Sequence, residues 1–304
     1  MRPPLWALLT AALLSGSARA GDLPDAAARV KDQLGTEAGR SAADRVLDYG
    51  KSLLGVPYVD GPFGEGPLGR YDRGPLYRFD AFDCTTFVET VTALSISDSW
   101  NGFKDSINRI RYKDGNVSFV DRNHITSLDW IPNNVRAGIY RDVTASLAPG
   151  LTLVARAEID KPAWFAKLPA SRVKIPELTD GERQALLESL HEEGGRFSAE
   201  EATVPYIPLA ALFGPGGAAV FDRIPSGSVV NIVRPNWDLV ALIGTHLNVS
   251  HQGFAVRDNG VLYFLEASEI DKKVSMVPLA DYLRPYLDSP TVKGIDVLVI
   301  AREP

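Results

Sequence analysis

The chain has 304 residues, a formal net charge of −6 and a single cysteine. The excess of acidic residues disfavours a nucleic-acid partner held through its phosphates, and one cysteine excludes an internal disulfide. Hydrophobic residues make up 45% of the chain and charged residues 23%, as in ordinary globular proteins. The length allows one large domain or two small ones, and we expect a monomer.

Residues 1–20 have the pattern of a secretion signal. A basic start precedes an apolar run over residues 5–14, and residues 18–20 (ARA) fit the small-x-small cleavage rule. The run is too short to span a bilayer, and Cys84 lies too far from the cleavage point to carry a lipid anchor. The sequence therefore predicts a periplasmic or secreted protein that begins near Gly21 and has no membrane anchor.

The remaining elements follow in chain order. Residues 25–54 repeat apolar side chains at helical spacing, a Gly/Pro-rich loop follows, and a helix is predicted to begin at Cys84. Residues 137–212 are predicted as an inserted helical and irregular segment, with one clear helix at 180–193, in a single domain of residues 21–304. β-strands are predicted over residues 228–233, 252–257, 261–267 and 295–300.

Cys84 stands out by its position. At a helix N-terminus, unpaired N–H groups and the helix dipole favour a thiolate over a thiol. In an exported chain this lone thiol has no internal partner, so it is either buried and inert or retained for chemistry. The position at a helix start favours chemistry.

A β-hairpin is predicted around Asn259 and Gly260, because Asn-Gly between two apolar runs favours a two-residue turn. In that register, side-chain alternation places His251, Gly253 and Glu266 on one face. Glu266 is then diagonal to His251 and within reach of its ring, and Gly253 is expected to leave the space beside them open. A slip of one residue would separate the two side chains.

Cys84, His251 and Glu266 together suggest the Cys–His–polar arrangement of a thiol hydrolase. In this arrangement the histidine takes or stabilises the thiol proton, and the third residue orients the imidazole. Each residue also has a structural alternative: a buried inert thiol, a strand histidine bonded to a backbone carbonyl, and a surface carboxylate.

A metal site is the competing chemistry. His124 with Asp129, or His246 with His251, offers ligand types that bind zinc, but no clustered His/Cys motif supports either pair. No phosphate-binding or dinucleotide-binding glycine loop follows a predicted strand. We therefore expect no cofactor and no metal.

The chain resembles the bacterial N-acetylmuramoyl-L-alanine amidase-like family, within the NlpC-like, papain-like superfamily of cell-wall cysteine hydrolases. The resemblance rests on motifs that run in family order from about residue 47 to the C-terminus. They are residues 83–89 (DCTTFVE), 110–115 (IRYKDG), 122–124 (RNH), 129–131 (DWI), 224–228 (IPSGS), and the segment from Ser250-His251 through Ala267-Ser268.

This resemblance implies an α+β papain-like fold, with N-terminal helices packed on an antiparallel sheet. It also implies hydrolysis of peptidoglycan or muropeptides at the amide between N-acetylmuramic acid and L-alanine, with Cys84, His251 and Glu266 as catalytic residues. The chain departs from the family at Gln252, where Val is frequent, and at Glu266, where His is common. A carboxylate can orient an imidazole and favours a thiolate–imidazolium pair.

Two other functions stay open: a stem-peptide endopeptidase of the same fold, and a non-catalytic wall-binding protein on a decayed hydrolase scaffold. The resemblance also places Tyr112, His124, Asp129 and Trp130 near the site. These four residues either line the substrate cleft opposite Cys84 or serve as core and turn residues.

Overall fold

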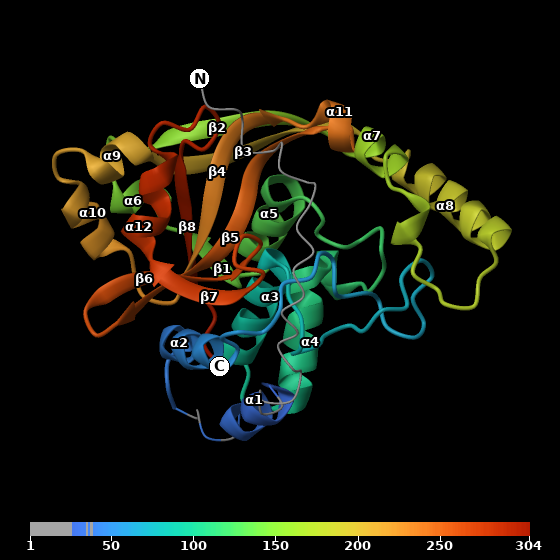
Figure 1. The fold of residues 1–304 in the computed structure, drawn as a ribbon, viewed down its shortest axis with the longest axis horizontal. Coiled ribbons are helices and arrows are strands. Elements are labelled where there is room, and N and C mark those ends of the chain that lie inside the picture. Colours follow the sequence, from blue (N-terminus) through green and yellow to red (C-terminus); the bar gives the residue numbers. More distant parts are fainter. Residues whose placement is uncertain (1–25, 35, 37–38) are drawn as a thin grey trace, which may run out of the picture.

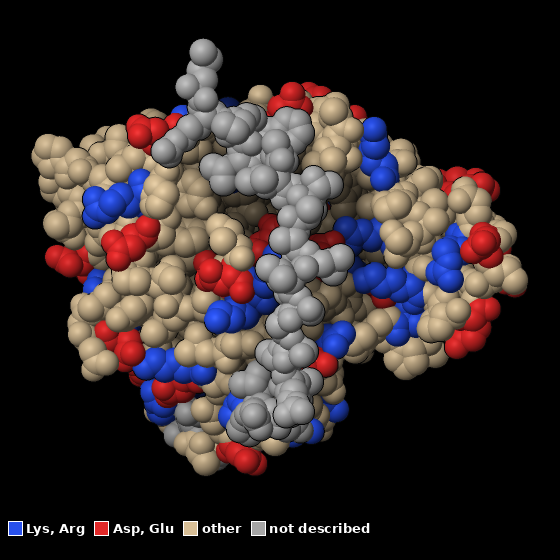
Figure 2. Space-filling model, viewed as in Figure 1, with Lys and Arg blue, Asp and Glu red and all other residues tan. Residues whose placement is uncertain are grey.

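The computed structural model describes residues 26–34, 36 and 39–304. The predicted secretion signal over residues 1–20 lies outside the described residues. Within the described ranges, no helix combines the length and the apolar character needed to cross a bilayer. On the face shown in Figure 2, Lys and Arg are interspersed with Asp and Glu, which agrees with the small net negative charge.

An antiparallel β-sheet forms the centre of the fold (Figure 1). Its strand order is β2-β3-β8-β4-β5-β6-β7, with β1 paired to β8, and every strand pair among the described residues is antiparallel. The strands are β1 (Tyr140–Asp142), β2 (Leu153–Asp160), β3 (Ala199–Pro208), β4 (Ser228–Asp238), β5 (His246–Asp258), β6 (Val261–Ser268), β7 (Lys273–Pro278) and β8 (Gly294–Ile300). The expected α+β class with an antiparallel sheet is confirmed.

Helices cover both faces of this sheet (Figure 1). One side is covered by α2 (Ala42–Ser52), α3 (Cys84–Ser95) and α4 (Trp100–Arg111), with α1 (Ala26–Leu34) beyond them. The other is covered by α6 (Thr144–Leu147), α9 (Leu209–Phe213), α10 (Gly217–Arg223) and α12 (Leu279–Leu283). The remaining short helical elements are α5 (Ile131–Arg136), α11 (Val240–Ile243), η1 (Lys113–Gly115), η2 (Thr126–Trp130), η3 (Ala170–Arg172) and η4 (Arg284–Tyr286).

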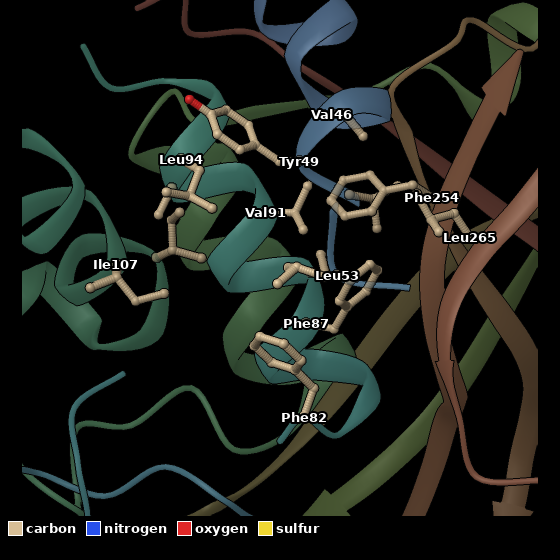
Figure 3. Packing of buried hydrophobic residues seen from close by; sticks show 14 of the residues in the cluster. Val46, Tyr49, Leu53, Phe82, Phe87, Val91, Leu94, Ile107, Phe254 and Leu265 are labelled. Carbon is tan, nitrogen blue, oxygen red and sulfur yellow. The ribbon is translucent and has the colours of Figure 1, made fainter. Parts of the chain in front are cut away.

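The helix that begins at Cys84 is buried along most of its length. Its residues Phe87 and Val91 pack with Val46 of α2 and with Phe254 and Leu265 of β5 and β6, as Figure 3 shows. The rings of Phe87 and Phe254 meet edge to face, with centroids 6.1 Å apart. This apolar contact joins the cysteine-bearing helix to the predicted hairpin.

The predicted helical segment at residues 25–54 contains two helices rather than one. Ser41 caps α2 by accepting a hydrogen bond from the Asp44 N–H, and Gly39 before it has a φ of +84°. A left-handed glycine and a serine cap start a new helix at this point. An apolar period alone does not reveal such an interruption.

Residues 137–212 contain more β-structure than expected. The predicted helix at 180–193 is confirmed as α8 (Asp180–Gly194), capped by Thr179, and it projects with α7 (Lys161–Ala166) from the body of the molecule (Figure 1). The description of this segment as helical and irregular was wrong, because it also supplies β1, β2 and β3. Strands β1 and β3 pair with β8, so the segment extends the central sheet. The domain boundary stays a prediction.

The hairpin of β5 and β6 has the predicted turn. Asn259 and Gly260 have positive φ values of 48° and 80°, and Asp258 pairs with Val261. The expected open space at Gly253 was wrong. A Cβ at this position would lie 2.6 Å from Cε2 of Phe264, whose ring fills the space.

Candidate functional site

Cys84 is the first residue of α3 and is partly exposed. Asp83 caps the helix by accepting a hydrogen bond from the Thr86 N–H at 2.7 Å, and the Thr86 hydroxyl accepts one from the Asp83 N–H at 2.9 Å. The Asp83 carboxylate also accepts a hydrogen bond from the Gly61 N–H at 3.1 Å. This capping box sets the helix start and leaves the thiol at its positive end.

His251 and Glu266 are brought together as predicted. Nε2 of His251 forms an ion pair and a hydrogen bond with Oε2 of Glu266, whose side chain is buried. Strands β5 and β6 pair from the turn as far as Phe254 and Leu265. The contact between His251 and Glu266 therefore lies just beyond the paired part of the hairpin. With Nε2 engaged by the carboxylate, Nδ1 is the ring nitrogen left to face another group.

A hydrogen bond joins the helix of Cys84 to the strand of His251 through the residues that follow them in the chain. Thr85, which follows Cys84, donates a 3.0 Å hydrogen bond to Oε1 of Gln252, which follows His251. Burial by itself lowers the pKa of His251, but the negative charge of the Cys84 thiolate, a hydrogen bond with it, and Glu266 together raise that pKa to about 10. The arrangement therefore favours the protonated form of the His251 imidazole.

Two tyrosines near these groups were not found from the sequence. Burial raises the pKa of Tyr58, and the charge of Cys84 raises it further; its neighbour Val59 donates a 2.8 Å hydrogen bond to the Phe82 carbonyl. Burial also raises the pKa of Tyr282, with added effects of Glu266 and Cys84. Neither residue belongs to a motif that contains Cys84, so no sequence signal identified them.

A buried polar ladder extends from the start of α3 across the sheet. Gln252 donates from Nε2 to Oδ1 of Asn231 at 2.7 Å, and Asn231 donates from Nδ2 to Oδ2 of Asp296 at 2.6 Å. The Thr144 hydroxyl donates to Oδ1 of Asp296 at 2.9 Å. Because Asp296 accepts at one end, both amides are oriented so that Gln252 presents its oxygen to Thr85.

The four residues predicted near the substrate cleft occupy interior positions. Tyr112 is buried and donates its hydroxyl to the Gly64 carbonyl at 3.0 Å. Trp130 is fully buried against Tyr140. Asp129 pairs with Lys161, with Oδ1 and Nζ 2.8 Å apart. These contacts give each of the three residues a structural role in the interior. Contact with a substrate stays a prediction for each.

His124, the fourth of these residues, is a core histidine in this structure. Its ring packs against Phe119 and Trp164, with centroids 4.7 Å away in each case, and Nε2 lies 2.7 Å from the Phe119 carbonyl oxygen. Burial lowers the pKa of His124 well below its ordinary value. The ring is therefore neutral, and its contact with a substrate also stays a prediction.

Two of the family-like motifs meet beneath the site. Arg111 donates from Nη1 to Oε2 of Glu89 on α3 at 2.9 Å and from Nη2 to the Phe63 carbonyl at 3.2 Å, with all of these groups buried. The motifs at residues 83–89 and 110–115 thus join the Gly/Pro-rich loop to the cysteine helix. The buried Arg111 and Glu89 thereby hold α3 against this loop.

Neither of two surface cavities is lined by Cys84, His251 or Glu266. One, of about 250 Å³, is lined by the end of α3 and by α4, including Asp98 and Arg109. The other, of about 440 Å³, lies beside α1 and is lined by Tyr77 and Trp100. Within the described residues, no three His, Cys, Asp or Glu side chains cluster as metal ligands do, so no residue is assigned to a metal or cofactor.

Comparisons with known proteins identify relatives. A family model described as AmiA-like, N-acetylmuramoyl-L-alanine amidase-like, matches residues 48–288. A Legionella pneumophila protein superimposes with a TM-score of 0.87 at 37% identity, over 91% of this chain and 95% of that chain. An N-acetylmuramoyl-L-alanine amidase from Bacteroides uniformis gives 0.60 at 29% identity, over 86% and 99%. A putative xylanase from Bacteroides fragilis gives 0.60 at 27% identity, over 84% and 100%. No match was found among curated proteins.

The polar ladder leads to a prediction for Asp296→Asn. Burial and the negative charge of Asp142 raise the pKa of Asp296 to about 7, whereas an unfolded aspartate titrates at about 4. Between these values the unfolded chain releases a proton that the folded chain retains, so this residue lowers the free energy of unfolding as pH rises from about 4 to 7. Asparagine cannot ionise, so the variant should lack this contribution.

Urea unfolding of both proteins between pH 4 and pH 8 measures the effect. The difference in unfolding free energy between variant and wild type should grow in favour of the variant up to about pH 7. The exposed Asp288→Asn substitution is the matched control and should show no such trend. A pH-independent difference for Asp296→Asn would contradict the buried, protonated carboxyl.

Proposed function

The chain belongs to the N-acetylmuramoyl-L-alanine amidase-like family, and we propose that it is an exported cysteine amidohydrolase of peptidoglycan. The bond proposed is the amide between N-acetylmuramic acid and L-alanine. Family membership supports a peptidoglycan hydrolase, and the amidase from Bacteroides uniformis is a structural relative. Export is part of the proposal, since the substrate lies outside the cytoplasm and residues 1–20 have the pattern of a secretion signal.

One observation carries the cysteine mechanism. His251 is held by Glu266 on one side, while the charge and hydrogen bonding of Cys84 act on the same ring. A thiolate–imidazolium pair with an orienting carboxylate is the arrangement that activates a cysteine nucleophile. It also supports the proposed placement in the NlpC-like, papain-like superfamily, with a helix-borne Cys, a strand-borne His and a polar residue on the next strand.

The proposed reaction has two steps. The Cys84 thiolate attacks the lactyl carbonyl carbon of N-acetylmuramic acid, and the N–H groups of Cys84 and Thr85 at the open start of α3 bind the oxyanion. The His251 imidazolium protonates the L-alanine nitrogen as the C–N bond breaks, which leaves a thioester. Neutral His251 then takes a proton from water, whose oxygen attacks the thioester carbonyl carbon. The C–S bond breaks, so that the lactyl acid leaves and the Cys84 thiolate and the His251 imidazolium are restored. Glu266 keeps the ring oriented in both steps.

The test is digestion of purified muropeptides by the mature protein, with products identified by mass. We expect separation of the sugar from an intact stem peptide. Cys84→Ala should abolish this cleavage without loss of structure, because alanine keeps the helix start and removes the nucleophile. Thermal unfolding of the variant serves as the control for folding.

Other product patterns have definite meanings. Cleavage within the stem peptide would replace the amidase by an endopeptidase of the same fold. Activity of Cys84→Ala above a trace of the wild-type rate would overturn the thiol mechanism. Absence of any cleavage by the wild-type protein would favour the non-catalytic wall-binding alternative.

A second prediction concerns Glu266→Gln, which keeps the shape of the side chain and removes its charge. The imidazolium of His251 is then less stabilised, so its pKa falls below the wild-type value of about 10. Because the protonated ring is lost as pH rises through this pKa, the alkaline limb of kcat/KM should move to lower pH. We expect kcat to fall roughly 10- to 1,000-fold.

Two comparisons complete this prediction. Glu266→His, which introduces the residue common in the family, should recover part of the loss. Glu177→Gln at an exposed position should leave the rate and its pH profile unchanged. If Glu266→Gln behaves like Glu177→Gln, Glu266 has no role in orienting His251.

A further inference from the structure

Arg234 on β4 is a half-buried arginine beside the histidine strand. Its Nε donates a 3.0 Å hydrogen bond to the hydroxyl of Ser250, the residue that precedes His251. Its Nη1 donates to the Thr291 hydroxyl at 3.0 Å. The guanidinium also lies over the ring of Trp237, 4.4 Å from its centroid. These contacts hold the planar group in one orientation.

This guanidinium has no anionic partner in the described part of the chain. It donates its hydrogen bonds to two neutral hydroxyls. Burial lowers the pKa of Arg234. By contrast, the buried Arg111 pairs with Glu89, and the half-buried Arg122 pairs with Glu65. A desolvated charge without a counter-ion is costly, and a bound anion would remove this cost.

The environment of Arg234 connects it to the proposed reacting groups. Tyr286 and Tyr282 lie close enough to Arg234 for their hydroxyl groups to act on its pKa, against the effect of burial. The Tyr282 ring in turn stacks near His251, with centroids 6.4 Å apart, and the charges of Glu266 and Cys84 act on its hydroxyl. An anion held by Arg234 would therefore lie close to the scissile bond.

We propose that Arg234 binds a free carboxylate of the stem peptide and so selects acidic stems. This inference rests on the proposed peptidoglycan substrate. The stem peptide begins with L-alanine, has a glutamate as its second residue and ends in a C-terminal carboxylate. The free carboxylate of the glutamate and the C-terminal carboxylate are both planar anions that fit the guanidinium fork. Trp237 fixes the orientation of the guanidinium plane. The hydrogen bonds to Ser250 and Thr291 use Nε and Nη1, so that, among the described residues, Nη2 is left for the ligand.

Three disaccharide-tetrapeptides test this assignment: the parent with both carboxylates free, its counterpart with an α-amide on the second residue, and its counterpart with an amidated C-terminus. We expect wild-type kcat/KM to be roughly 10- to 100-fold lower for one of the two amides, the range of a charge-assisted hydrogen bond. The amide that loses activity identifies the carboxylate. Equal rates on all three substrates would overturn the proposal.

Arg234→Gln should remove this preference, with most of the loss on the parent substrate and little on the discriminated amide. Arg234→Lys, which keeps the charge but lacks the fork, should be intermediate. Arg156→Gln is the control, because Arg156 forms an exposed ion pair with Glu201 and should keep the wild-type preference.

The two proposals fail in different ways. Cleavage of every substrate without preference removes the carboxylate site and leaves the amidase intact. A wild-type protein that cleaves none of the three contradicts the proposed amidase and the inference that rests on it. A preference that persists unchanged in Arg234→Gln would assign the recognition to another residue.

Discussion

The packing of α3 against β5 and β6 is the interaction on which the candidate site depends. Cys84 is more than 160 residues from His251 in the sequence, so no local preference brings them together. The burial of Phe87 and Val91 against Phe254 and Leu265 brings them together. Each large apolar side chain removed from water stabilises this contact by about 1.5–3 kcal/mol. This apolar contact sets how close the helix lies to the hairpin, and the capping box determines which residue is at its tip.

Polar groups then fix the register within that apolar interface. The hydrogen bond from Thr85 to Gln252 continues through Asn231 to Asp296, and a buried ladder of this kind is satisfied in only one alignment of helix and strand. Gln252 is one of the two positions at which the chain departs from the family pattern. We infer that Gln252 aligns the helix with the strand. Its presence is therefore explained without assuming that the site has lost its catalytic function.

The local parts of the site were predictable because their signals are local. A helix start at Cys84 was predicted from the sequence, and the reach of Glu266 to His251 follows from the Asn259-Gly260 turn. The strands β1 to β3 were missed because their pairing, of β1 and β3 with β8 and of β2 with β3, is decided by distant residues. Tyr58 and Tyr282 were missed for the same reason, since only the folded chain places them near the cysteine. Arg234 was missed because only the folded chain places it beside Ser250. The Phe264 ring beside Gly253 shows that an absent side chain does not imply empty space.

An NMR titration of the histidine rings tests the central claim most directly, because the chain has only 4 histidines. The thiolate–imidazolium pair requires His251 to stay protonated well above neutral pH, with a pKa near 10, while His124 stays neutral as an internal reference. In Cys84→Ala the His251 pKa should fall, because the thiolate that sustains it is gone. A His251 ring that titrates near its ordinary value of about 6.5, with no change in Cys84→Ala, would contradict the account.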